Sequence, residues 1–333
     1  MTFQTPMVEL EALQLDPRGP QVVAIGGGHG LAAALTAVQS YASHITAIVS
    51  VADDGGSSGR LTAGLGIPPV GDIRRCLLAL TPEPTIWSEL FTYRFDAGAG
   101  IFDPASVEPR DVDGHSLGNL ILAALADLHG EFGRAVAEAG RLLNSVGTVV
   151  PAANDAIGLS AIVGGRRVDG QVAVARARGG VERLILGPEG IQAHPDAIDA
   201  IEAADQIVLG PGSLFTSVMA ALLVPGIVEA VDRASGRIAL VLNLVTQDGE
   251  TLGLSGHEHV SSLTRHAGLI RPGGIVAHRG PLQVPEGHDA VAIEAEEANA
   301  LGWTIHHSDV ADHRAEWPAH DPMKLGRALA ALA

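Results

Sequence analysis

The amino-acid sequence predicts a Rossmann-like α/β fold with a doubly wound, mainly parallel sheet and a small additional β-rich region. Two observations carry this prediction. Short, continuously apolar runs, such as residues 21–25 and 45–52, are typical of strands buried on both faces of a parallel sheet. Only 3% of the residues are aromatic, so the core must consist of Leu, Val, Ile and Ala, which suits helices packed on such a sheet.

The first part of the chain alternates apolar strands, glycine turns and helices. Residues 1–20 read as a flexible leader, and residues 21–333 as one domain. In order, we expect a strand at 21–25, a turn at 26–30, a helix at 31–41, a strand at 45–52, a loop at 53–60, and helices at 73–80, 87–93, 116–128 and 132–143.

The residue pattern changes at 148–187 and predicts a β-rich insertion. Short segments at 148–150, 158–163, 171–175 and 181–186 are separated by Gly, Arg and Asp, as in an antiparallel or mixed set of strands. The α/β pattern then returns. We expect helices at 194–203, 214–223 and 323–332, strands at 206–209, 237–244, 274–277 and 303–306, and a loop at 210–213.

Composition limits the class of protein. The formal net charge of −17 argues against binding nucleic acid or an anionic membrane, so an anion site would have to be locally positive. Cys76 is the only cysteine, which excludes an internal disulfide and favours a reducing compartment. The N-terminus lacks the pattern of a signal peptide, and the longest apolar stretch, residues 218–228, is too short to span a bilayer. We therefore expect a cytoplasmic protein.

Three glycine-containing loops, residues 26–30, 53–60 and 210–213, each separate a predicted strand from a helix. Glycine lets backbone N–H groups approach a polyanion, hydroxyls donate to it, and the guanidinium of Arg60 can grip phosphate. Ligands of parallel sheets bind beyond the carboxyl ends of the strands, so we expect the three loops to converge on one cleft. A plain turn, a polar surface loop or an N-cap without a ligand remains the alternative for each loop.

The first loop does not complete a dinucleotide fingerprint, because Leu31 and Ala33 stand where a third glycine would be needed. NAD is therefore disfavoured as a ligand. Asp72 and His115 stand at helix starts and could equally be an N-cap and a buried imidazole. Asn243 is more informative, because an amide at the end of a buried strand needs partners that a ligand could supply.

The sequence thus provides a set of candidate ligand-binding residues, while no histidine spacing indicates a metal site. The segment 257–259 has the wrong period for two ligands on one helix face and is interpreted as a solvated surface. The candidates are Gly27, Gly28, His29, Gly30, Asp53, Asp54, Gly55, Ser57, Ser58, Arg60, Asp72, Arg74, His115, Asn119, Gly210, Gly212, Ser213, Thr216 and Asn243.

These motifs, in their order along residues 21–325, resemble the YvcK-type gluconeogenesis factors, in an actinobacterial-like branch. The resemblance is carried by residues 26–30, 51–60, 71–74, 114–119, 210–217, 223–227 and 243–251. It implies a Rossmann-like fold shared with the 2-phospho-L-lactate transferases, a cytoplasmic location, and binding of UDP-sugars such as UDP-N-acetylglucosamine. It also implies a role in cell shape and wall synthesis during gluconeogenic growth, without a firm catalytic activity.

The chain departs from this family at three positions. His29 stands where many members have Thr, Leu254 replaces a frequent aromatic residue, and Ala319 replaces an arginine before His-Asp-Pro. Leu254 cannot stack a uracil ring. These exchanges affect the identity of the nucleotide more than the fold.

Two functions of different classes follow. The first is a non-enzymatic regulator that senses a UDP-sugar, needs no cofactor, and acts on an enzyme of amino-sugar or wall-precursor synthesis, with a homo-oligomer expected. The second is a phosphotransferase similar to 2-phospho-L-lactate transferase, in which Asp53 and Asp54 hold Mg²⁺ against a transferring phosphate. An NAD-dependent oxidoreductase is third. We favour the regulator, because no second acidic cluster is visible to complete a two-metal site.

Overall fold

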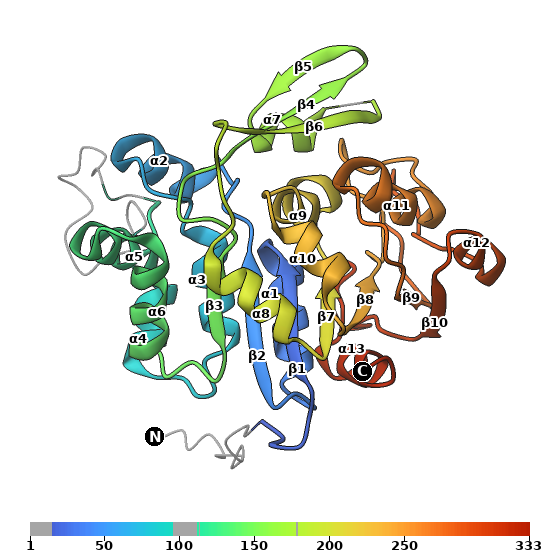
Figure 1. Ribbon diagram of the computed structural model, residues 1–333, viewed down its shortest axis with the longest axis horizontal. Coiled ribbons are helices and arrows are strands. Elements are labelled where there is room, and N and C mark those ends of the chain that lie inside the picture. Colours follow the sequence, from blue (N-terminus) through green and yellow to red (C-terminus); the bar gives the residue numbers. More distant parts are fainter. Residues whose placement is uncertain (1–14, 96–111, 113, 178) are drawn as a thin grey trace, which may run out of the picture.

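The computed structural model describes residues 15–95, 112, 114–177 and 179–333 (Figure 1). Within these residues seven parallel strands form the main sheet, in the order β10-β9-β8-β7-β1-β2-β3. Helices flank this sheet, which confirms the predicted Rossmann-like α/β fold. The strands are β1 (Gln21–Gly26), β2 (His44–Val49), β3 (Thr148–Pro151), β7 (Gln206–Leu209), β8 (Arg237–Val241), β9 (Gly274–His278) and β10 (Thr304–Ser308).

The central strands are apolar along their whole length because both of their faces are covered. In β1 every residue after Gln21 is buried, and Ile25 pairs with Ile48 of β2 and Leu209 of β7. The chain builds the sheet outward from β1 to β3, and then returns to the other side of β1 to add β7 through β10. The direction of winding therefore reverses between β1 and β7, where α/β sheets open a crevice for ligands.

The helices pack in two groups against the sheet. α1 contacts α3 and α13, whereas α8 contacts α10 and the strands β1 and β3. The helices are α1 (Gly28–Val38), α2 (Gly56–Leu65), α3 (Gly71–Ala79), α4 (Ile86–Thr92), α5 (Leu117–His129), α6 (Phe132–Leu142), α7 (Gln171–Arg176), α8 (Pro195–Ala203), α9 (Ala220–Leu222), α10 (Ile227–Arg233), α11 (Gly256–Ser262), α12 (Ala295–Ala300) and α13 (Pro322–Ala330). Two π-helical segments are η2 (Leu214–Met219) and η3 (Leu263–Ala267).

The small antiparallel sheet projects from the main body, and it corrects two predictions (Figure 1). It consists of β4 (Gly158–Val163), β5 (Arg166–Asp169) and β6 (Val181–Gly187), in the order β5-β4-β6. Residues 148–150 do not belong to it, because β3 pairs with β2 in the main sheet. The predicted strand at 171–175 is the helix α7, whose N-terminus is held by a side chain from another loop.

Other differences concern element ends and several helices that the sequence did not reveal. α1 begins at Gly28, inside the predicted turn, and α2 begins at Gly56, inside the predicted loop 53–60. The predicted helix at 214–223 is π-helical over its first six residues. The strand β5 and the helical segments α10, α11, η3 and α12 were not predicted from the sequence.

Residues 1–14 of the predicted leader lie outside the described residues. In the part of the chain that the structure describes, no single helix has the length and apolar character needed to cross a membrane. One bent pair, Leu214–Leu222 with Ile227–Arg233, meets that criterion by length and composition alone.

Candidate functional site

A cavity of about 640 Å³ lies where the winding of the sheet reverses, at the carboxyl ends of β1, β7 and β8. This is the position at which open α/β sheets bind ligands. Its lining comes from His29, Gly30 and Ala33 of α1, Pro211 and Gly212 after β7, residues 243–248 after β8, His288, and residues 317–320. The three glycine loops follow the adjacent strands β7, β1 and β2, but residues 53–60 are not part of the cavity lining, whereas residues of the first and third loops are. The expected convergence of all three loops on one cleft therefore stays a prediction.

The glycines of the first loop serve different purposes. Gly28 has φ +65°, and a Cβ atom there would meet nothing within 4 Å. A Cβ on Gly30 would collide with the Pro211 carbonyl oxygen, so Gly30 is required for close packing of α1 on the loop after β7. Gly28 therefore leaves open space at the N-terminus of α1, whose first-turn N–H groups lack acceptors within the helix.

Asp72, on α3, already occupies part of this helix terminus. Its Oδ2 accepts a hydrogen bond of 2.6 Å from the Gly28 N–H, and its Oδ1 pairs with the Arg75 guanidinium. Gly27 permits this approach, because a Cβ there would lie 2.6 Å from Asp72 Oδ2. Beside this pair, burial and then the Arg75 charge lower the pKa of His29, so its imidazole is neutral at pH 7.

Asp53 and Asp54 face different partners. Asp53 Oδ1 accepts a 2.9 Å hydrogen bond from the Gly55 N–H, which closes a local turn before α2. Burial raises the pKa of Asp53, and the nearby Asp72 charge acts in the same direction. Asp54 Oδ1 instead accepts from the Val172 N–H at 2.9 Å and caps α7. The charges of Asp72 and Asp54 both raise the pKa of Asp53, so Asp72 joins the predicted pair of Asp53 and Asp54.

A buried polar chain connects α2, α3 and α5. Ser57 Oγ lies 2.8 Å from His115 Nδ1 and accepts a 3.0 Å bond from Asn119 Nδ2. Asn119 Oδ1 accepts from Arg74 Nε at 2.9 Å, and burial lowers the pKa of Arg74 to about 10. Burial and then the Arg60 charge lower the pKa of His115, so its ring is neutral. These four candidate residues lie together but are already hydrogen-bonded to one another.

The remaining two candidates on α2 differ in exposure. Ser58 is buried, and its hydroxyl packs on Gly71, where a Cβ would clash with it. Arg60 is exposed, and its guanidinium reaches Gly114 and the neighbourhood of His115. Neither residue lines the 640 Å³ cavity.

The third loop holds an internal carboxylate at the start of η2. Glu250, which the sequence analysis did not select, accepts hydrogen bonds from the Phe215 N–H at 2.6 Å and the Thr216 N–H at 2.9 Å. The hydroxyls of Ser213 and Thr216 also hydrogen-bond to this carboxyl group. Burial raises the pKa of Glu250 despite these donors. Ser213 and Thr216 thus bind a protein carboxylate, so a ligand role for them would have to be indirect.

Asn243 joins the end of β8 to the loop after β7. Its Oδ1 accepts from the Gly212 N–H at 3.0 Å, and its Nδ2 donates to the Gly212 carbonyl oxygen at 2.8 Å. The amide therefore satisfies its backbone partners without a ligand, contrary to the reasoning that made it a candidate. Together with His29, Gly30 and Gly212, it forms part of the cavity wall.

The structure adds residues to the site that were not predicted. Gln247, His288, Trp317 and His320 line the cavity. Trp317 is a large aromatic residue in an otherwise polar segment, Gln247 lies in the segment 243–251 that carries the family resemblance, and His320 opens the His-Asp-Pro motif, so these three residues had a signal in the sequence. Burial lowers the pKa of His320 to about 4, and its Nε2 lies 3.2 Å from the Leu242 carbonyl oxygen.

The predicted solvated face at 257–259 is corrected in part. His259 is buried at the start of α11, and its Nδ1 lies 2.8 Å from the Ser255 carbonyl oxygen. No group of three or more His, Cys, Asp or Glu side chains suited to hold a metal ion occurs among the described residues.

Comparisons with known proteins agree on one family. The model of the family described as "2-phospho-L-lactate transferase CofD" matches residues 22–311. A protein named "Gluconeogenesis factor" in Bacillus subtilis is 38% identical over 321 residues, covering 94% of this chain and 98% of that protein. A second one, from Halalkalibacterium halodurans, is 37% identical over 309 residues, covering 88% of this chain and 92% of that protein.

A solved structure shows the same fold. The crystal structure of a Bacillus halodurans protein superimposes with a TM-score of 0.86 at 35% sequence identity, covering 94% of this chain and 99% of that one. A second structure of that protein, described as a member of the UPF0052 family, gives the same values.

Proposed function

The chain belongs to the CofD family, and on this premise we propose that it binds a nucleotide sugar of the UDP-N-acetylglucosamine type and acts as a non-enzymatic regulator. The observation that carries the proposal is the cavity of about 640 Å³ at the reversal point of the sheet. Its volume lies in the range of small-molecule sites. The relatives named gluconeogenesis factor support a role linked to gluconeogenic growth.

The polar groups suggest how such a ligand lies. The first turn of α1 offers N–H groups and a positive helix end to the diphosphate beside Gly28. The carboxylates of Asp72 and Asp53 are not part of the cavity lining, and they would be acceptors for ribose or sugar hydroxyls of a ligand that extends past it. In this arrangement binding requires no metal ion. The effect on cell shape would then pass to a partner enzyme of amino-sugar or wall-precursor synthesis.

A second candidate function is Mg²⁺-dependent phosphoryl transfer. It is favoured by the transferase name of the family model and by the proximity of Asp53 to Asp72, whose charge raises the pKa of Asp53. In that case the two carboxylates would hold the cation against a phosphate. Asp54 contributes less than the sequence suggested, because one of its oxygens caps α7.

Calorimetry and phosphorus NMR distinguish the two functions. We expect UDP-N-acetylglucosamine to bind saturably in the presence of EDTA, to raise the melting temperature, and to keep its phosphorus spectrum unchanged when Mg²⁺ and protein are present. Ligand at 100 times Kd stabilises the folded state by about 2.7 kcal/mol. Metal-dependent turnover that disappears in Asp53→Asn would establish the transferase instead. If the protein binds neither UDP-N-acetylglucosamine nor UDP, the proposed function is wrong.

A further inference from the structure

One wall of the cavity is aromatic. The rings of His288 and Trp317 pack edge to face, with centroids 5.1 Å apart and planes at 79°, and both residues line the cavity. Trp317 nevertheless keeps 54% of its surface exposed. The His288 ring orients the indole, and one part of the indole surface stays accessible from the cavity. A planar group can stack on this apolar face.

The same wall contains two buried polar atoms without partners. Among the described residues, nothing hydrogen-bonds to His288 Nδ1 or to Gln247 Oε1. Of the ten buried polar side-chain atoms without a partner in the described part of the chain, these two belong to residues that line the cavity, so a ligand there can offer the partners that they lack. A flat ring with polar atoms along one edge would satisfy both while it stacks on Trp317.

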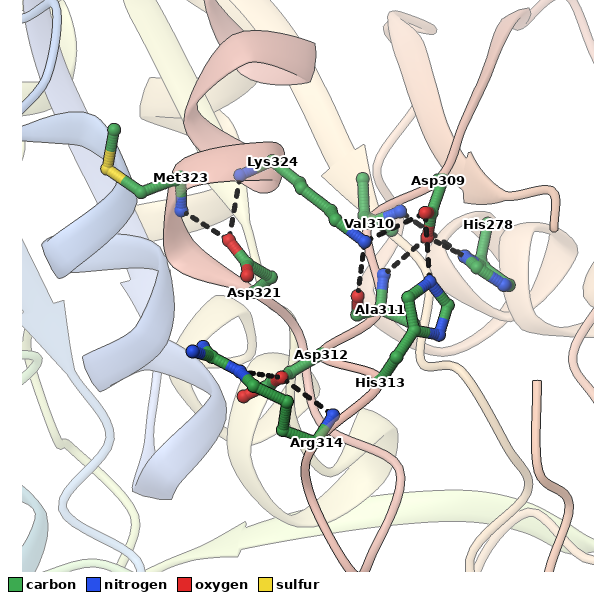
Figure 2. Close-up of polar contacts among 10 residues, drawn as sticks. All are labelled: His278, Asp309, Val310, Ala311, Asp312, His313, Arg314, Asp321, Met323 and Lys324. Carbon is green, nitrogen blue, oxygen red and sulfur yellow. Dashed lines mark hydrogen bonds and ion pairs between the residues drawn. The ribbon is translucent and has the colours of Figure 1, made fainter. Parts of the chain in front are cut away.

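Hydrogen bonds and an ion pair hold the ends of the segment 311–320, which carries Trp317 (Figure 2). Lys324 Nζ donates to Asp309 Oδ2 at 2.8 Å and to the Ala311 carbonyl oxygen at 2.9 Å. Ala311 in turn pairs with His320 in an antiparallel bridge. The loop between Ala311 and His320 is therefore closed at its ends. This closure holds the indole of Trp317 near the cavity and leaves the exposed face of the ring accessible.

We propose that Trp317, His288 and Gln247 form a nucleobase subsite, in which the indole stacks on a uracil-type ring and the two unpartnered atoms face its polar edge. This inference rests on the proposed function and names the part of the ligand that the wall recognises.

A base fits this wall better than the other parts of a nucleotide sugar. The described residues that line the cavity include no lysine or arginine, so the wall offers no cation to the diphosphate. A hexose carries several hydroxyls that each need partners, whereas the described residues that line the cavity hold two unpartnered buried atoms. Leu244, Val245 and Pro318 add apolar lining, which suits the face of a base.

The test compares three ligands and four proteins. UDP, UDP-N-acetylglucosamine and N-acetylglucosamine 1-phosphate are titrated by calorimetry and by tryptophan fluorescence into the wild type, Trp317→Ala, Trp317→Phe and Trp87→Ala. Trp87, on α4, is outside the cavity lining and serves as the matched control. We expect UDP to quench the tryptophan fluorescence of the wild type. Trp317→Ala should lower the affinity for UDP about tenfold or more, which is the effect of removing a stacking partner.

The conservative variant separates stacking from folding. Trp317→Phe is expected to recover most of the affinity for UDP while it loses the quenching, and both Trp317 variants should melt at the wild-type temperature. Equal affinity of Trp317→Ala and Trp87→Ala for UDP would overturn the subsite and leave nucleotide-sugar binding intact. A loss confined to the two sugar-bearing ligands would place the sugar on the indole instead. If the wild type binds none of the three ligands, both the subsite and the proposed function fail.

Discussion

Two glycines of one turn, separated by a single residue, illustrate how differently a glycine can be constrained. Gly28 is selected by its backbone, since φ +65° is costly for other residues, and the space beside it is open. Gly30 is selected by packing, since its missing Cβ leaves room for the Pro211 carbonyl oxygen. Both were predicted as ligand-binding glycines, and only the coordinates distinguish these two reasons.

The first prediction compares alanine at these two positions. Gly28→Ala should destabilise the protein by about 1–2 kcal/mol, because a left-handed backbone strains an L-residue. Gly28→Ala should also lower the affinity for the nucleotide sugar, because the added methyl group enters the open space beside α1. Gly30→Ala should destabilise more strongly, because α1 must move away from the loop after β7. Urea unfolding and calorimetry on both variants check this order, and a larger loss of stability in Gly28→Ala would contradict it.

At the scale of elements, several helix N-termini are capped by carboxylates from distant parts of the chain. Asp72 accepts from α1, Asp54 from α7, and Glu250 from η2. A carboxylate at this position satisfies N–H groups that the helix leaves unpaired and interacts favourably with the helix dipole. The loops that look like anion sites in the sequence are thus partly filled by the protein's own anions.

The second prediction concerns the cap of η2. Glu250→Ala should destabilise the protein by about 2–4 kcal/mol, because it leaves the Phe215 and Thr216 N–H groups buried and unpaired. Glu250→Gln keeps an accepting oxygen and should cost much less. Burial raises the pKa of Glu250, so its charged form is disfavoured in the fold, and the loss of charge in the glutamine variant is partly favourable. Chemical unfolding of both variants measures the difference, and equal losses would contradict the capping role.

The third prediction concerns the junction between α7 and the loop after β2. Asp54→Ala should leave the Val172 N–H without its acceptor and destabilise the small sheet locally. The amides of the main sheet should keep their protection from hydrogen exchange. Hydrogen exchange should therefore accelerate in residues 171–187 and remain unchanged in β1 and β7. Asp53→Ala is the neighbouring control, because the Asp53 carboxylate accepts its hydrogen bond from Gly55 in its own turn and not from α7. Unchanged exchange in 171–187 would show that Asp54 does not hold this helix.

At the scale of the whole molecule, histidines with lowered pKa values make stability depend on pH. Burial lowers the pKa of His320 to about 4, and of His29, His115, His259, His266 and His307 in the same direction. Between the folded and unfolded pKa values the unfolded chain binds more protons. The contribution of these groups to the free energy of unfolding is therefore lost as the pH falls from about 6.5 toward 4. The raised pKa values of Asp53 and Glu250 act in the opposite direction.

The fourth prediction isolates one of these groups. His320→Gln keeps a donor for the Leu242 carbonyl oxygen but cannot titrate. The decrease in the free energy of unfolding from pH 7 to pH 5 should be smaller in this variant by at most about 2 kcal/mol. Between pH 7 and pH 8 the two proteins should show the same dependence. Identical dependence between pH 7 and pH 5 would mean that His320 is protonated in the folded state.

The fold class, the buried strands and the two glycine loops that line the cavity, 26–30 and 210–213, were predictable from the sequence, because hydrophobic periodicity and glycine turns are local properties. The sequence also identified the family through the order of its motifs. Tertiary structure decided which partner each residue has. The pairing of β3 with β2, the helix at 171–176 capped by Asp54, the burial of Glu250 and the position of Trp317 all depend on contacts between segments far apart in the chain. Local sequence carries no record of such contacts, since strand pairing and the burial of a charge are decided only when distant elements pack together.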